Sequence, residues 1–241
     1  MALPKKKRRK KGRLKKVLMP ALTVVIAFCL LTSLQVLTLR FLNPPATVSM
    51  AWNWLKGQFG SKPYTWPKYP WRSLEDISPH LIKAVLAGED QRFFSHHGFD
   101  LIEMDRALRD ALTSGKTRGA STLTMQTARS VFLWPERSFI RKSMEAYYTI
   151  LIELLWNKRR IVEVYLNTVD WGRGVVGVEA AARRYFRKSS NQLKPSEAAA
   201  LAAILPSPHR WSPTNPDPVV RGRVERILKD MEHIPLGFER E

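Results

Sequence analysis

Cysteine is almost absent from this chain of 241 residues, which contains Cys29 and no other. A single cysteine excludes an intrachain disulfide framework and a zinc site built on several thiolates. The five histidines include no pair with the spacing that places two metal ligands on one helix face. The motifs Ser-x-x-Lys and Lys-Thr-Gly are also missing, which excludes an acylating serine of the penicillin-binding type.

Acidic residues are missing from the first 74 positions, although the chain carries 40 basic and 21 acidic residues in all. The net charge of +19 divides into +10 for residues 1–16, +5 for residues 17–74 and +4 for residues 75–241. Such a charge often indicates a nucleic-acid partner, and the basic run at 5–11 is typical of a nuclear localisation segment. The apolar run that follows argues against this interpretation, so no nucleic-acid partner is expected.

Residues 17–39 form an uncharged run of 23 residues. At about 1.5 Å per residue, a helix of that length crosses a hydrocarbon core about 30 Å thick. The run is longer than the apolar part of a signal peptide, and no small-x-small cleavage motif follows it before Arg40. We therefore predict a retained transmembrane helix over 17–39, with Pro20 near its start, where a missing N–H is tolerated.

The charges on either side of this helix predict its orientation. Ten basic residues precede it, whereas Arg40 alone lies close on the other side. The positive-inside rule then places the polybasic tail, 1–16, in the cytoplasm and the rest of the chain across the membrane.

The segment 40–74 is rich in aromatic residues and separates the apolar run from the rest of the chain. Trp and Tyr concentrate at membrane–water interfaces, so this neck can hold the following domain against the lipid headgroups. An ordinary packed part of the domain explains the composition equally well, and both interpretations stay open. The aromatic residues are Trp52, Trp54, Phe59, Tyr64, Trp66, Tyr69 and Trp71.

The chain from 75 to 241 has the apolar spacing of helices, and strand patterns are scarce, which predicts a mainly α domain. Its longest periodic segment, 138–166, predicts one central buried helix. The spacing Gly-x-Gly-x-x-Gly at 172–177 fits a dinucleotide-binding loop, but that loop needs a strand before it. The residues before it continue a helical pattern, so a turn between helices is the better interpretation.

Three stretches of this domain combine residue types that carry chemistry. The first, 88–100, has adjacent carboxylates at a helix end; the second, 118–129, mixes hydroxyls with an amide and two arginines; the third, 137–145, has three cations and then Glu145. Each alone fits a helix-end charge cluster with ordinary ion pairs. Together they suit transfer from a lipid-linked diphosphate to a sugar hydroxyl, because a carboxylate can act as the base and cations can hold the diphosphate.

These stretches resemble the glycosyltransferase family 51 domain, which polymerises peptidoglycan glycan strands from lipid II. The resemblance covers 76–218 and implies a lysozyme-like, mainly α fold. Its motifs are Glu-Asp-x-x-Phe-x-x-His-x-Gly at 89–98, Gly-x-Ser-Thr-x-Thr-x-Gln at 119–126, Arg-Lys-x-x-Glu at 141–145, Ile-Val-Glu-Val-Tyr-Leu-Asn at 161–167 and Glu-Ala-Ala-x-Leu-Ala-Ala at 197–203.

The resemblance also implies the roles of individual residues. Glu89 corresponds to the general base, which deprotonates the 4-hydroxyl of the acceptor GlcNAc as that oxygen attacks C1 of the donor MurNAc. Glu145 corresponds to the second catalytic carboxylate, near the donor diphosphate. The α-linked donor becomes a β-1,4 product, so a single inverting displacement is implied. Substrate binding is assigned to Asp90, Phe93 and His96, which shape the site, to Ser121, Thr122 and Gln126 in the cleft wall, and to Arg129, Arg137, Arg141 and Lys142 at the diphosphate.

The same resemblance implies the setting of the activity. No cofactor is required, although a divalent cation, Mg²⁺ or Mn²⁺, can assist at the diphosphate, and the sequence shows no closed ligand set for it. The lack of an acyl-transfer motif after 218 implies the monofunctional class, without transpeptidase activity, anchored in a bacterial inner membrane with a periplasmic catalytic domain at 75–241. The implied partners are lipid II, the growing lipid-linked strand, the membrane, and division or elongation proteins of cell-wall synthesis.

Four positions depart from the usual pattern of this family: Ala120, Met125, Arg129 and Ser130. Arg129 keeps a positive charge. Ser130 replaces a common Asn, and this departure bears most on the role that the resemblance implies for its residue.

Two rival functions stay open. A lysozyme-like peptidoglycan hydrolase also places two carboxylates at a glycosidic bond, but it has no diphosphate for the cations to hold. A non-catalytic membrane scaffold of cell-wall synthesis is the other rival.

Overall fold

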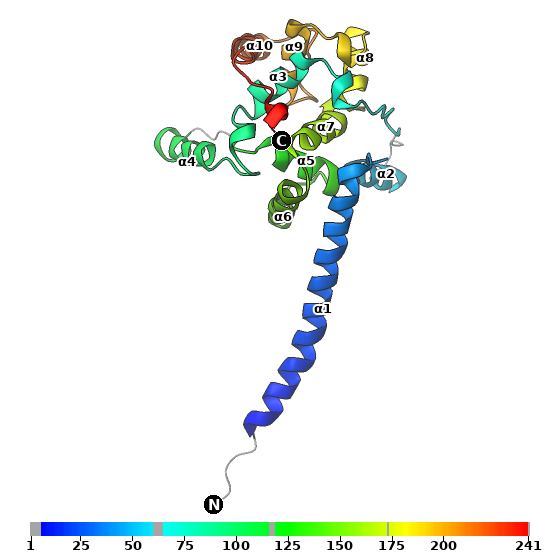
Figure 1. Ribbon diagram of the computed structural model, residues 1–241, viewed down its shortest axis with the longest axis vertical. Coiled ribbons are helices and arrows are strands. Elements are labelled where there is room, and N and C mark those ends of the chain that lie inside the picture. Colours follow the sequence, from blue (N-terminus) through cyan, green and yellow to red (C-terminus); the bar gives the residue numbers. More distant parts are fainter. Residues whose placement is uncertain (1–5, 60–64, 116–118, 173, 241) are drawn as a thin grey trace, which may run out of the picture. The chain divides into compact units, whose positions relative to one another are not determined.

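The structure is a computed structural model that describes residues 6–59, 65–115, 119–172 and 174–240. Helix makes up 67% of it, and ten α-helices lie in these ranges, so the predicted mainly α class is confirmed. The chain divides into two compact units, Met1–Leu42 and Asn43–Glu241, and each is described by itself (Figure 1). Residues 1–5 of the predicted tail and 60–64 of the predicted neck, with Tyr64, lie outside the described residues.

The first unit is built on helix α1, Lys6–Phe41. Its stretch Met19–Phe41 is long and apolar enough to cross a membrane, and 11% of its most apolar part is buried. A helix that is apolar and exposed nearly all round suits lipid better than a soluble core. The hydroxyls of Thr23, Thr32 and Thr38 each donate to the carbonyl four residues earlier, so these polar groups are satisfied within the helix.

Pro20 lies in the interior of α1, so the prediction that it stands near the helix start is wrong. The helix begins at Lys6 because lysine and arginine are good helix formers, and the basic run therefore continues the apolar segment as one helix. A proline at an interior position leaves the carbonyl of residue 16 without its usual backbone donor.

One helix group of the second unit contains α3 (Pro79–Glu89), α9 (Pro195–Ile204) and α10 (Pro218–Asp230), which pack against one another. The residues of α9 from Ala198 to Ile204 are all buried, and five of the seven are alanines. Small side chains allow neighbouring helices to approach closely. The carboxyl end of α3, at Glu89, therefore lies beside α10 (Figure 1).

The other helix group contains α5 (Leu123–Phe132), α6 (Phe139–Leu155) and α7 (Lys158–Thr168), with α5 packed against both of the others. The predicted single helix over 138–166 is wrong, because the chain breaks between α6 and α7. Trp156 is extended, and Asn157 caps α7 by accepting a hydrogen bond from the backbone N–H of Arg160 at 2.9 Å. The apolar periodicity continues across the break, so the sequence pattern did not reveal the N-cap at Asn157.

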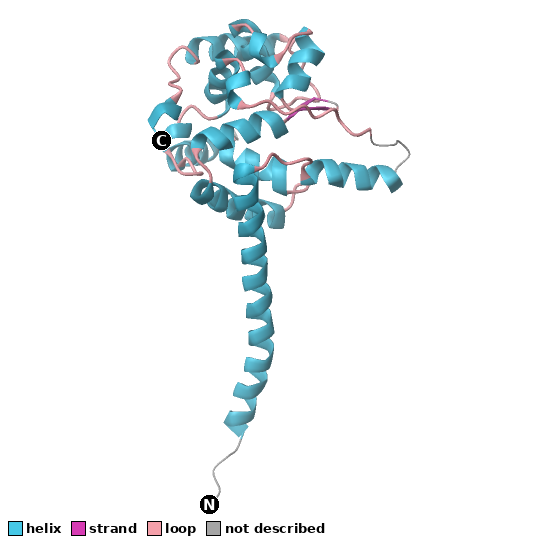
Figure 2. Ribbon diagram, turned by 45° about the vertical axis from the view of Figure 1, so that its right-hand side comes forward, coloured by secondary structure: helices cyan, strands magenta, loops and turns pink. Residues whose placement is uncertain are grey.

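A short antiparallel hairpin of β1 (Asp170–Gly172) and β2 (Val175–Val176) joins α7 to α8 (Val178–Phe186) (Figure 2). The residues 161–167 before these glycines are helical, as expected, but the predicted turn between helices contains two short strands, with Gly172 at the end of β1 and Gly177 directly after β2. Gly177 has φ +82°, and an added Cβ would lie 2.7 Å from the carbonyl oxygen of Asn167. Glycine is the residue that tolerates both conditions.

The neck contains a helix that the sequence interpretation did not include, α2 (Val48–Phe59). Met50 is buried, α2 packs against α5, and the indole N–H of Trp52 donates to Glu136 at 2.8 Å. Trp54 and Phe59 are 47% and 86% exposed. Packing within the domain explains part of the neck, and contact of its exposed aromatic residues with lipid headgroups stays a prediction.

A buried carboxylate ties the end of the neck to the core. Glu179 of α8 accepts hydrogen bonds from Arg72 at 3.0 Å, from Arg183 at 2.7 Å and from the backbone N–H of Ser190 at 2.9 Å. Burial by itself would raise the pKa of Glu179, but its hydrogen bonds outweigh burial and lower the pKa to about 2. The carboxylate therefore stays ionised and holds the segment that leads into α3.

Candidate active site

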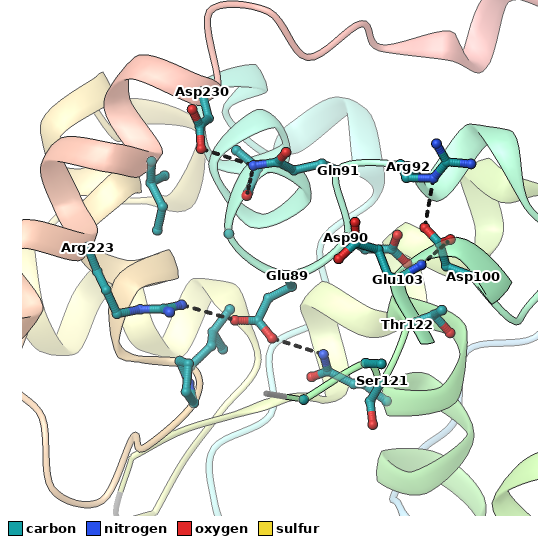
Figure 3. Close-up of a pocket in the computed structure, with 18 of the residues that line it drawn as sticks. Glu89, Asp90, Gln91, Arg92, Asp100, Glu103, Ser121, Thr122, Arg223 and Asp230 are labelled. Atoms are coloured by element: carbon teal, nitrogen blue, oxygen red, sulfur yellow. Dashed lines mark hydrogen bonds and ion pairs between the residues drawn. The ribbon is translucent and has the colours of Figure 1, made fainter. Parts of the chain in front are cut away.

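A cleft of about 840 Å³ lies between the two helix groups of the second unit. Its walls are the carboxyl end of α3 with the loop that follows, the helix α4 (Leu101–Ser114), the start of α5, and α10 (Figure 3). Half of the predicted site residues line it, and these are Glu89, Asp90, Ser121, Thr122, Gln126 and Arg129. The cleft therefore joins the first two of the three stretches that carry chemistry.

Glu89 is the last residue of α3, and 11% of its side chain is exposed. Its Oε2 accepts a hydrogen bond from Nε2 of Gln126 at 2.9 Å, and its Oε1 lies 3.7 Å from Nη2 of Arg223 (Figure 3). Oε1 is buried and, within the described ranges, has no hydrogen-bond partner. One carboxylate oxygen is thus held in place, while the lone pairs of the other are unused.

The charge environment of Glu89 suits a base. Burial raises its pKa, and the effect of burial exceeds the opposing effects of the Gln126 hydrogen bond and of the Arg223 and Arg129 charges. A general base works best when its pKa lies near the operating pH, so a raised carboxyl pKa favours this role.

Gln126 is oriented by a second hydrogen bond from the opposite side. The hydroxyl of Tyr165, in α7, donates to Oε1 of Gln126 at 3.3 Å. Burial raises the pKa of Tyr165 well above its usual value, so this hydroxyl stays protonated and remains a donor. The amide oxygen of Gln126 therefore faces Tyr165, and its NH₂ group faces Glu89.

Asp90 supports the site by joining the loop that follows Glu89 to helix α5. Its Oδ1 lies 2.9 Å from Nε2 of His96, and its Oδ2 accepts the backbone N–H of Leu123 at 2.8 Å, in the first turn of α5. A carboxylate near a helix N-terminus is stabilised by the free N–H groups there. This pair of contacts holds the loop after Glu89 against the helix that carries Gln126.

Phe93 and His96 are buried behind the cleft and are not among its lining residues. The ammonium group of Lys158 lies 4.4 Å from the centre of the Phe93 ring and donates to the carbonyl oxygen of His96 at 2.7 Å. The same ammonium group pairs with Glu153 at 2.9 Å. These buried contacts fix the loop 90–98, so Phe93 and His96 can shape the site only from behind.

A divalent cation finds no free set of ligands among these residues. Asp90, His96 and Asp100 bring ligand atoms within 4.8 Å of one another. However, Asp90 is bonded to His96 and Leu123, while Asp100 caps α4 and pairs with Arg92 at 3.0 Å. The carboxylate oxygens of this cluster are thus already used by protein donors, so the cluster does not fit a divalent cation.

The wall between α4 and α5 is formed by the segment 119–122. Ser121 and Thr122 both line the cleft, and Thr122, which is largely buried, also donates to the carbonyl oxygen of Gly98 at 2.6 Å and caps α5. Ser130, at the position of a common Asn, donates to the carbonyl oxygen of Gln126 at 2.8 Å. Its hydroxyl is thus used within α5.

The predicted residues of the third stretch are not part of the cleft lining. On α6, Glu145 is buried and accepts from Nη1 of Arg141 at 2.6 Å and from Nζ of Lys142 at 2.5 Å. Arg137 is exposed in the segment before α6. In the structure, the carboxylate of Glu145 is therefore paired with two cations and is not free.

Comparison with known proteins gives the family. Residues 57–232 match the Transglycosylase family. The chain is 46% identical over 199 residues to the biosynthetic peptidoglycan transglycosylase of Pseudomonas entomophila, which covers 83% of this chain and 84% of that protein. It is 44% identical over 213 residues to the protein of that name from Shewanella oneidensis, at 88% of this chain and 89% of that one. The chain belongs to the transglycosylase family.

In this transglycosylase, the family match continues past the predicted limit of 218 and includes α10. That helix supplies Arg223, Arg226 and Asp230 to the cleft. The sequence interpretation missed them because a polar helix after a proline-rich segment has no motif that marks its arginines. The sequence interpretation also missed Tyr165, whose hydroxyl orients Gln126. Its place in the motif at 161–167 was the only sequence signal that pointed to this residue.

Proposed function

We propose that this transglycosylase polymerises lipid II into β-1,4-linked glycan strands, with undecaprenyl diphosphate as the leaving group. The observation that carries the proposal is the state of Glu89, whose Oε2 is held by Gln126 while Oε1 is unbonded in a cleft lined by arginines. Membership of the family and the names of the relatives support a peptidoglycan glycosyltransferase activity.

The proposed step is a single inverting displacement. Oε1 of Glu89 takes the proton from the 4-hydroxyl of the acceptor GlcNAc, and that oxygen forms a bond to C1 of the donor MurNAc. The bond from C1 to the diphosphate oxygen breaks, and the electron pair leaves with the diphosphate. Attack from the face opposite the leaving group converts the α-linked donor into a β-linked product.

Cations stabilise the charge that develops on the leaving diphosphate in this proposal. Arg129 and Arg226 line the cleft and form no ion pair within the described residues. Arg137, Arg141 and Lys142 are the further candidates, with Glu145 holding the last two in a fixed geometry. Guanidinium groups bind phosphate oxygens through paired N–H donors, so these side chains can hold the diphosphate, and a divalent cation that assists there stays a prediction.

The cleft also suits an amphipathic substrate. α4 contributes Glu103 and Arg106 to the lining, yet it has no buried residue. Its apolar side chains, Leu101, Leu108 and Leu112, are 72%, 59% and 77% exposed. A charged cleft beside an exposed apolar helix fits a ligand with a sugar diphosphate and a lipid tail.

Incubation of the purified full-length chain with labelled lipid II tests this function. We expect detergent-solubilised protein to convert lipid II into polymer of many disaccharide units, resolved by gel electrophoresis. No polymer, together with breakdown of preformed glycan, would identify a lysozyme-like hydrolase instead. No change in either substrate would favour a scaffold.

We further propose that α1 anchors the protein in the inner membrane, with its N-terminus in the cytoplasm and residues 43–241 in the periplasm. The ten basic residues before the apolar segment support this orientation. A reporter enzyme that works only outside the cytoplasm should be active when it is fused after Glu241 and inactive when it is fused after Lys16. The reverse pattern would overturn the topology.

Division or elongation proteins as partners stay a prediction, which co-purification from crosslinked cells would test.

A further inference from the structure

Arg223 is the residue of α10 that approaches the proposed base. Its Nη2 lies 3.7 Å from Oε1 of Glu89, and 25% of its side chain is exposed (Figure 3). Its Nε donates to the carbonyl oxygen of Ala203, in α9, at 3.1 Å, and its guanidinium group lies 6.0 Å from the ring centre of Trp211. The end of α3, the end of α9 and the segment that follows α9 thus surround one side chain.

These contacts hold the guanidinium group in one place. The hydrogen bond to Ala203 uses the carboxyl end of α9, where backbone carbonyls lack helical partners. Trp211 offers its ring as a second support. The remaining 3.7 Å to Glu89 is too long for a hydrogen bond, so Arg223 provides a positive charge without occupying the oxygen that must accept the proton.

We propose that Arg223 is a positioning residue, which orients the Glu89 carboxylate from the side opposite Gln126 and keeps it ready to accept the acceptor's proton. This inference rests on the proposed function and adds a residue to which the sequence motifs assign no role. Gln126 and Arg223 would then hold the two oxygens of Glu89 from opposite walls of the cleft, one by a hydrogen bond and one by charge.

The pH profile of the reaction distinguishes this role from simple structural support. The groups that face Glu89 are Gln126 and Arg129 from α5, Asp90 from the end of α3, Tyr165 from α7, and Arg223. Burial and the Asp90 charge raise the pKa of Glu89, whereas Gln126, Arg223 and Arg129 lower it. Loss of Arg223 removes one lowering effect, so the pKa of Glu89 rises further. The base is active when it is deprotonated, and activity is then lost at a higher pH as the solution is acidified.

The test compares full-length Arg223→Gln, Arg223→Lys and the control Arg221→Gln in the lipid II assay across pH. Arg221 lies on the same helix, is exposed and is not part of the cleft lining. We expect Arg223→Gln to lower kcat at neutral pH by about 10- to 100-fold with little change in KM, because a small displacement of the base has effects of that order. The acidic limb of its pH–rate profile should move to higher pH. Arg223→Lys should bring this limb back toward its wild-type position. The control should match wild type.

Two results would overturn the role of Arg223 when wild type and the control polymerise lipid II. One is a folded Arg223→Gln protein with unchanged kcat and an unchanged acidic limb. The other is a rise in KM while kcat and the acidic limb stay unchanged, which would assign Arg223 to binding of the substrate's diphosphate. If Arg223→Gln does not fold, the same comparison is made with Arg223→Lys. Failure of wild type itself to form polymer would overturn the proposed function.

Discussion

Glu89→Gln is expected to reduce polymerisation of lipid II by about 10³-fold, the size of a general-base contribution. The amide has the shape of the carboxylate but cannot take the acceptor's proton at neutral pH. Its carbonyl oxygen can still accept the hydrogen bond from Gln126, and Arg223 keeps its contacts with Ala203 and Trp211. We therefore expect the thermal unfolding midpoint of the full-length protein to change by less than about 3 °C.

The matched control for this prediction is Glu225→Gln. Glu225 lies on α10, is exposed and does not line the cleft. Its substitution by Gln therefore removes the same negative charge at a position outside the cleft. Rates should be measured with labelled lipid II at several pH values, because burial raises the pKa of Glu89 and wild-type activity should decline as pH falls through that pKa. A Glu89→Gln protein that polymerises at a rate close to wild type would refute the assignment of the base.

Glu145→Gln is expected to lower both stability and activity. Glu145 is 1% exposed and holds Arg141, which is 7% exposed, so the amide leaves a buried guanidinium group without its counter-charge. Breaking a buried ion pair in this way destabilises a protein by about 3–5 kcal/mol. The expected consequence is a fall in the unfolding midpoint of roughly 10 °C, measured by thermal scanning, together with loss of polymer.

A second variant separates the two effects at Glu145. Combining Glu145→Gln with Arg141→Met removes both members of the buried pair, and replacement of such pairs by apolar groups is often neutral for stability. We expect the double variant to regain most of the unfolding midpoint and none of the polymerisation, because the proposed diphosphate cations are then depleted. Polymerisation near the wild-type rate in the double variant would show that Glu145 and Arg141 serve the fold alone.

Helix content and the family were predictable from residues close together in sequence. The mainly α class is confirmed, and the peptidoglycan glycosyltransferase class agrees with the family and its relatives. The error at 138–166 has a physical reason. Apolar spacing reports which face of a segment is buried, and that face continues across Trp156 and Asn157 while the backbone turns. The N-cap at Asn157 was the local signal against a single helix.

The candidate site was only partly predictable. The motifs at 89–98 and 119–126 meet at one cleft, where Gln126 bonds to Glu89. The third motif lies on α6, with its carboxylate already paired. Among the described residues, the closest cation to Glu89 is Arg223, which no motif marks, since a single arginine on a polar helix resembles any solvated charge.

Interactions within about four residues set the apolar span of α1, the helix starts and the carboxylate at the end of α3, and these can be read along the chain. The packing of α9 against α3 and α10 decides what surrounds that carboxylate. Burial, the hydrogen bond from Gln126 and the charge of Arg223 all reach Glu89 from other helices. A raised pKa and a free oxygen are properties of that environment, because desolvation and charge act through space and not along the sequence.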